Sequence, residues 1–84
     1  MENNKTNLAR KYEWELGVLV NQIEMCQQQI GKLEDRRYLV SRVEAEERLQ
    51  FEIETWEQLK ENLELEHISI ANLLIDTEEP VHIN

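Results

Sequence analysis

The spacing of Glu64 and His67 is the pattern in this sequence most typical of metal chemistry. The two residues form a Glu-x-x-His motif, which places both side chains on one face of a helix. Di-iron proteins built on four-helix bundles use this motif twice and add a carboxylate from each remaining helix. A homodimer would supply two copies, and Glu15 is expected to face Glu64. Glu15, Glu64 and His67 are therefore candidate metal ligands under one hypothesis, a di-iron carboxylate bundle.

A second interpretation of these residues involves no metal, and we take it as the leading one. Glutamate is so abundant here that one is expected three residues before a histidine by chance, and His67 falls on an apolar stripe, opposite Tyr12. The sequence has no glycine-rich phosphate loop, cysteine pair or G-x-S-x-G motif. Cys26 has no evident base and lies at a core position. We therefore expect no enzyme, no catalytic residue, no cofactor and no resident metal.

An unbroken heptad stripe indicates the fold class. Its apolar positions are separated alternately by four and three residues, which is the spacing of a helix that packs against another helix. The first stripe consists of Tyr12, Leu16, Leu19, Ile23, Cys26, Ile30 and Leu33. The second includes Leu49, Ile53, Trp56, Leu63, Ile70 and Leu74. These stripes predict the packing seam of an all-α protein.

The two stripes predict two helices rather than one. Their register is lost between Val40 and Leu49, where Ser41 and Glu44 have the spacing of a capping box. We predict an antiparallel hairpin in which Ile23 faces Trp56. A single long helix in a parallel coiled coil is the alternative. The expected segments are a polar stretch 1–6, a helix 7–37 capped by Thr6, a turn 38–41, a helix 42–75 and a tail 76–84.

The chain carries more apolar residues than two helices can bury against each other. Trp14 lies on the far face of the first helix, and the segment 67–75 is apolar nearly all round, which is typical of burial on several sides. A second copy completing a four-helix bundle would cover these residues, as so short a domain requires. The predicted partner contacts are Trp14, Ile68, Ile70, Leu73, Leu74 and Ile75.

The charge pattern limits the kinds of partner. The formal net charge is −9, and most of the acidic residues follow Val43. Binding of nucleic acid through a basic face is therefore not expected, whereas an acidic half can either oppose a basic partner or simply be solvated. We expect no membrane partner, because no apolar run is long enough to span a bilayer. The single cysteine and the polar N-terminus favour a cytoplasmic location.

The stretch Ala45–Leu59, which follows a first helix rich in Leu, Gln and Glu, resembles the helical-hairpin effector-associated domains of bacterial conflict and defence systems. The resemblance covers residues 10–66. It implies a module that oligomerises or recruits a partner carrying the same hairpin, with no catalytic residues. The leading hypothesis is thus a non-enzymatic interaction module, an oligomerising adaptor or regulatory subunit that binds protein partners as a homo-oligomer or within a larger hetero-complex. The alternative is an acidic inhibitor, an antitoxin or phage-type antagonist, that occupies a basic site.

Overall fold

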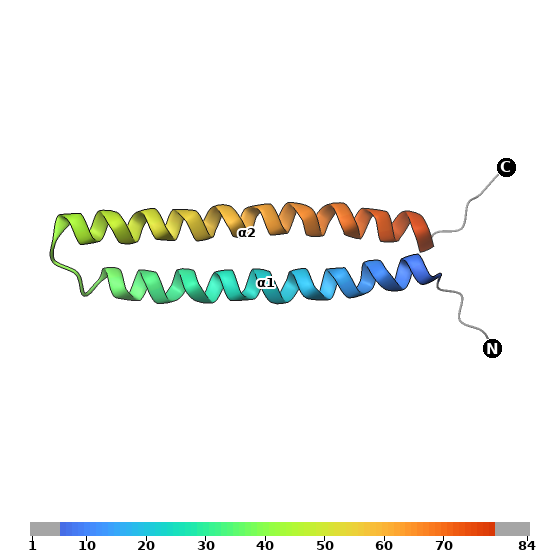
Figure 1. Cartoon of the computed structure of the whole chain (residues 1–84), viewed down its shortest axis with the longest axis horizontal. Coiled ribbons are helices and arrows are strands. Elements are labelled where there is room, and N and C mark those ends of the chain that lie inside the picture. The colour runs from blue at the N-terminus through green and yellow to red at the C-terminus, as the bar shows by residue number, and fades with distance from the viewer. Residues whose placement is uncertain (1–5, 79–84) are drawn as a thin grey trace.

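Two antiparallel helices make up the described part of the chain. The computed structural model describes residues 6–78, in which α1 spans Asn7–Arg37 and α2 spans Val43–Glu78 (Figure 1). The two helices pack against each other along their length, so the prediction of an all-helical protein with two packed helices is confirmed. Most of the polar stretch 1–6 and most of the tail 76–84, including His82, lie outside the described residues.

Local hydrogen bonds define both ends of α1. The Thr6 hydroxyl accepts from the Ala9 backbone N–H at 3.0 Å, which satisfies a donor that has no partner within the helix. At the other end, the Leu39 N–H donates to the Arg36 carbonyl at 3.0 Å. The Val40 N–H donates to the Arg37 carbonyl at 3.3 Å. These tighter bonds finish the helix as a 3₁₀ turn and direct the chain into the loop.

The start of α2 differs from the predicted capping box. The Glu46 N–H donates to the Arg42 carbonyl at 3.0 Å, so Arg42 occupies the N-cap position. Ser41 therefore precedes the cap by one residue, and the box between Ser41 and Glu44 is one position too early to close. Val40, directly before Ser41, packs against the buried cluster between the helices.

The end of α2 lies three residues beyond the predicted one. The sequence analysis ended this helix at Ile75, whereas α2 continues to Glu78. A proline disfavours helical geometry chiefly at the residue directly before it, which here is Glu79. Nothing in the segment 76–78 therefore opposes the helix, and the side chain of Thr77 donates back to the Leu73 carbonyl at 2.8 Å.

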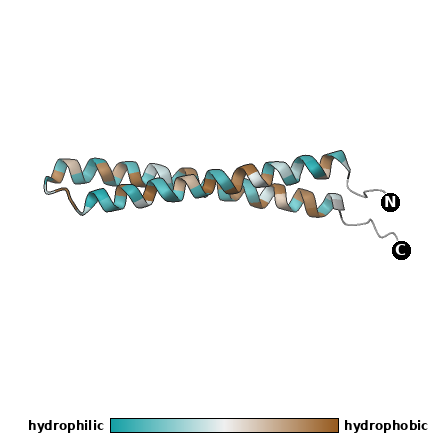
Figure 2. Ribbon diagram, turned by 90° about the horizontal axis from the view of Figure 1, so that it is seen from below, coloured by the Kyte–Doolittle hydropathy of each residue, from teal (hydrophilic) through white to brown (hydrophobic). Residues whose placement is uncertain are grey.

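The tightest packing is near the loop. Ile30 and Leu33 of α1 pack against Leu49 and Ile53 of α2, and Val40 and Trp56 flank this cluster. Ala9, Leu19 and Cys26 are buried further along α1, whereas α2 has no buried residue after Ile53 within the described range. Seen edge-on, the two ribbons cross at a small angle, and apolar positions recur along both of them (Figure 2).

The pairing of the two helices is shifted by about one heptad from the predicted register. The Arg37 guanidinium donates to Gln50, Trp56 lies beside Cys26, and Ile23 lies in a hollow with His67. The predicted pairs Ile23–Trp56 and Tyr12–His67 are therefore wrong. A shift of seven residues returns each stripe to the same face, so the seam is unchanged while the partners differ.

This shift leaves α2 longer than α1 at the loop end. The part of α2 before Gln50 extends past the last turn of α1 by roughly 10 Å at 1.5 Å per residue (Figure 1). The loop of residues 38–42 continues beyond the end of α1, alongside this overhang, to reach the start of α2 (Figure 1). No residue in the described range has a positive φ, so the connection needs no glycine.

Truncation of the core should separate buried from exposed apolar residues. Ile53 is 2% exposed, and Ile53→Ala should lower the free energy of unfolding by about 2–4 kcal/mol through lost burial and a residual cavity. Leu65 is 58% exposed, so Leu65→Ala should change it by less than about 0.5 kcal/mol. Urea unfolding followed by circular dichroism, at one fixed protein concentration, measures both. Equal losses would contradict the packing of this core.

Candidate interaction surfaces

The candidate metal ligands do not assemble within one chain. Glu64 and His67 line a shallow hollow together with Val20 and Ile23, whereas Glu15 lies in a different hollow, beside Trp14. Glu15 does not approach Glu64 because the two residues lie on opposite sides of the packing seam, in different hollows. Among the described residues, no group of three His, Cys, Asp or Glu side chains is arranged to hold a metal ion. A single hairpin therefore does not form a di-iron site.

The packing seam divides the surface of the hairpin into two flanks. On one side, two hollows lie along the seam, and both are lined by Gln22. On the other side lies the hollow that contains His67. The heptad positions next to the seam in both helices assign the remaining residues to one flank or the other. The two flanks differ in charge, so we describe them separately.

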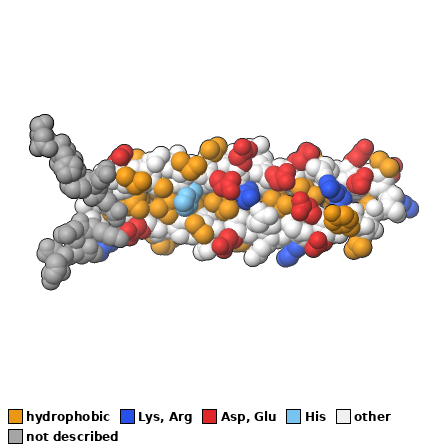
Figure 3. Space-filling view, turned by 180° about the vertical axis from the view of Figure 1, so that it is seen from behind, with side chains coloured by type: hydrophobic (Ala, Val, Ile, Leu, Met, Phe, Trp, Pro, Cys, Tyr) orange, Lys and Arg blue, Asp and Glu red, His pale blue; other side chains and the backbone are white. Residues whose placement is uncertain are grey.

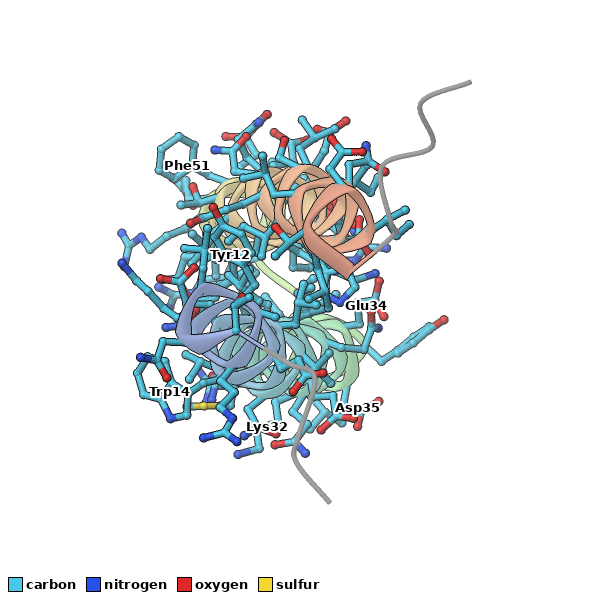
Figure 4. The ribbon with its side chains drawn as sticks, turned by 90° about the vertical axis from the view of Figure 1, so that its right-hand side faces the viewer. Tyr12, Trp14, Lys32, Glu34, Asp35 and Phe51 are labelled. Carbon is cyan, nitrogen blue, oxygen red and sulfur yellow. The ribbon has the colours of Figure 1, made fainter. Side chains whose placement is uncertain are left out.

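The first flank contains a groove made of two neighbouring hollows that share Gln22. Val18, Gln22, Met25, Gln29 and Leu59 line its two hollows, and the half-buried Trp56 lies at its floor. Two aromatic side chains, Trp14 from α1 and Phe51 from α2, project to this side and are each 70% exposed (Figure 4). Two exposed aromatic residues beside one apolar groove are typical of a protein-binding surface.

The charges of this flank are balanced and separated along its length. Near the loop it carries the basic residues Lys32, Arg36 and Arg48, with Glu52. Near the opposite end it carries the acidic residues Glu15, Glu66 and Asp76, with Lys11. The hollow between these two groups, around Met25 and Leu59, has no charged residue in its lining, whereas Glu15 and Glu66 line the other hollow. We call this surface the balanced flank.

The second flank is strongly acidic. It carries Arg10 and the glutamates Glu13, Glu24, Glu34, Glu47, Glu54, Glu57, Glu61 and Glu64. Acidic side chains are distributed along the face that displays His67 (Figure 3), and Glu34 projects to the side opposite Trp14 and Phe51 (Figure 4). We call this surface the acidic flank. The negative charge of the protein is therefore concentrated on one side of the hairpin.

The predicted partner contacts do not form one patch. Trp14 and Leu73 lie on the balanced flank, where Leu73 is 46% exposed. Ile68 and Ile75, at 55% and 53%, lie on the acidic flank. Ile70 and Leu74 are half-buried on the seam.

The sequence analysis did not select Met25, Phe51 and Leu59 as contacts, although they belong to the same surface as Trp14. The heptad positions of Met25 and Leu59, on the same side of the seam as Gln22 and Val18, are the signal that identifies these two residues.

Neither described glycine serves a close approach between helices. A Cβ atom added at Gly17 or Gly31 would meet nothing within 4 Å, so neither position requires a glycine for contact with α2. Neither described helix has both the length and the apolar character needed to cross a membrane.

No family model, no curated protein and no solved structure matches this chain.

The acidic flank should reduce the stability of α2. Glu57 lies three residues after Glu54 and four before Glu61, and each such like-charge pair costs about 0.2–0.5 kcal/mol. Glu57→Lys converts both pairs into attractions and turns the attraction to Lys60, three residues later, into a repulsion, so the free energy of unfolding should rise by about 0.4–1 kcal/mol at low salt. In 1 M NaCl, where the Debye length is about 3 Å, the gain should largely vanish. A gain that persists unchanged in high salt would contradict an electrostatic cause.

Proposed function

We propose that this chain is a non-enzymatic helical interaction module that oligomerises and acts as a cytoplasmic adaptor or regulatory subunit. The observation that carries the proposal is the exposure of large apolar side chains on both helices, while few are buried between them. The exposed ones are Leu8, Trp14, Val20, Met25, Tyr38, Leu39, Val43, Phe51, Leu59, Leu65, Ile68, Leu73 and Ile75. The resemblance to helical-hairpin effector-associated domains of bacterial defence systems supports the same function.

The magnitudes favour association. An aromatic side chain buries about 150–250 Å², and Trp14 and Phe51 are each 70% exposed. Covering both corresponds to a gross gain of about 5–9 kcal/mol at 25 cal/mol per Å². Association costs about 4–15 kcal/mol in lost translation and rotation. The further burial of Met25 and Leu59, exposed by 62% and 43%, therefore shifts the balance toward a complex.

The protein should be at least dimeric at micromolar concentration. Sedimentation velocity should give a species of at least twice the 10.1 kDa chain mass, with a helical circular dichroism spectrum. The variant Trp14→Ser with Phe51→Ser removes two exposed aromatic side chains and should shift the equilibrium toward monomer. A stable, fully helical 10.1 kDa monomer of the unmodified chain would contradict oligomerisation.

The acidic flank favours one alternative function, an inhibitor that occupies a basic site on another protein. Glu54, Glu57, Glu61 and Glu64 follow one another at spacings of three and four residues, so they form one line along α2. Such a line of carboxylates can occupy a basic groove on a partner in place of that groove's acidic ligand. The opposite charges also increase the rate of association between the two proteins. An antitoxin or phage-type antagonist would use the surface in this way.

Salt dependence separates the two functions once a partner has been isolated from the host. For an adaptor that binds through apolar residues, the association rate should change little between about 50 and about 300 mM NaCl, a range over which the Debye length falls roughly twofold. For an inhibitor, the rate should fall steeply, and Glu54→Lys with Glu61→Lys should lower it further. Surface plasmon resonance measures both. We expect the weak dependence, and a steep fall would favour the inhibitor.

A further inference from the structure

A two-fold contact between copies of this hairpin would place a flank against the same flank, because such contacts are isologous. The acidic flank would then set its eight glutamates against eight more, which is unfavourable across an interface. The balanced flank carries as many basic as acidic residues, and its central hollow, around Met25 and Leu59, has no charged residue in its lining. Charge therefore selects the balanced flank for contact with a second copy.

The distribution of charge along the balanced flank also selects an orientation. With both loops at the same end, the basic group around Arg36 and Arg48 would meet its own copy. With the loops at opposite ends, that group would meet the acidic group that contains Glu15 and Asp76. Complementary potentials favour the second arrangement and disfavour the first.

One position of the two-fold axis brings acidic and basic residues of the two copies together on both helices. In α1, Glu15 and Arg36 are equally distant from the midpoint between Met25 and Cys26. In α2, Arg48 and Asp76 are equally distant from Asn62. These two midpoints lie side by side, since Cys26 shares a hollow with Leu59 and Leu63, which bracket Asn62.

The same axis also brings exposed apolar residues together. Met25, which is 62% exposed, lies next to the axis and would meet the partner's Met25. Phe51 is 70% exposed and lies as far to one side of Asn62 as Leu73 lies to the other. Phe51 would therefore pack near the partner's Leu73. Polar and apolar matches thus agree on one geometry.

We propose that a second copy of this chain docks on the balanced flank, with the loops at opposite ends and a two-fold axis that passes beside Met25 and Asn62. Glu15 then pairs with the partner's Arg36, and Arg48 pairs with the partner's Asp76. The inference rests on the proposed oligomerisation and specifies its partner surface. Both acidic flanks face outward in this dimer.

Charge reversal at one of these pairs tests the geometry. Within one chain, Glu15 and Arg36 are separated by roughly 32 Å along α1, so any compensation between them must act between chains. Glu15→Arg and Arg36→Glu should each weaken self-association about tenfold, because each sets like charges together at two symmetric contacts. Mixed in equal amounts, the two variants should form a heterodimer with the affinity of the unmodified protein.

The matched control is Glu24→Arg, the same reversal on the acidic flank of α1, which should not weaken the dimer. Sedimentation of differently labelled variants measures all these affinities, and circular dichroism verifies folding. A homodimer that both reversals leave intact, or a mixture that associates no better than its components, would overturn this geometry. In those cases the proposed oligomerisation stands, whereas a monomeric unmodified protein would overturn the proposed function itself.

A cross-link provides a second test that does not depend on charge. In a Cys26→Ala background, Met25→Cys places one thiol beside the axis in each copy, so air oxidation should yield a covalent dimer. Gln28→Cys in the same background, on the outer face of α1, is the control and should yield little. Equal cross-linking at the two positions would overturn the proposed axis.

Discussion

A helix that packs against a single neighbour can bury only one stripe of its surface. In this hairpin the stripe is the heptad seam, and its best-packed part is the cluster around Ile30 and Ile53 near the loop. Within the described helices, the other apolar side chains lie on a flank or on an outer face. The exposure of Trp14, Met25 and Phe51 therefore follows from the number of helices and not from a local defect in packing.

The sequence was sufficient for the fold class and the seam, because both depend on a periodicity that local composition displays directly. It was not sufficient for the pairing of the helices. A heptad pattern matches itself after every seven residues, so Ile23 opposite Trp56 and Ile23 beside His67 use the same seam. The choice between these two pairings depends on contacts at the loop end of the hairpin. These are the packing of Val40 against the core and the contact of Arg37 in α1 with Gln50 in α2.

The interaction surfaces were only partly predictable for a related reason. The sequence indicates that Trp14 and Ile68 lie outside the packing seam. The flank of the hairpin on which each one lies depends on how the two helices pack together. Charge gives the clearest example. Along the chain the acidic residues are concentrated after Val43, whereas in the hairpin they separate across the seam, with glutamates of both helices on one flank. The predicted metal set does not assemble, because Glu15 lies on one side of the seam while Glu64 and His67 lie on the other.

The two turns of α2 that extend past α1 have a mechanical consequence. Because the seam repeats every two turns, sliding one helix along the other by one repeat preserves most apolar contacts between them. The contacts that oppose such sliding are concentrated where Val40 and Arg37 meet α2. A ligand or a change in length at the loop would therefore act on the whole hairpin, displacing the far end of α2 by roughly 10 Å relative to α1. The loop is the place from which a local event would be transmitted along the entire molecule.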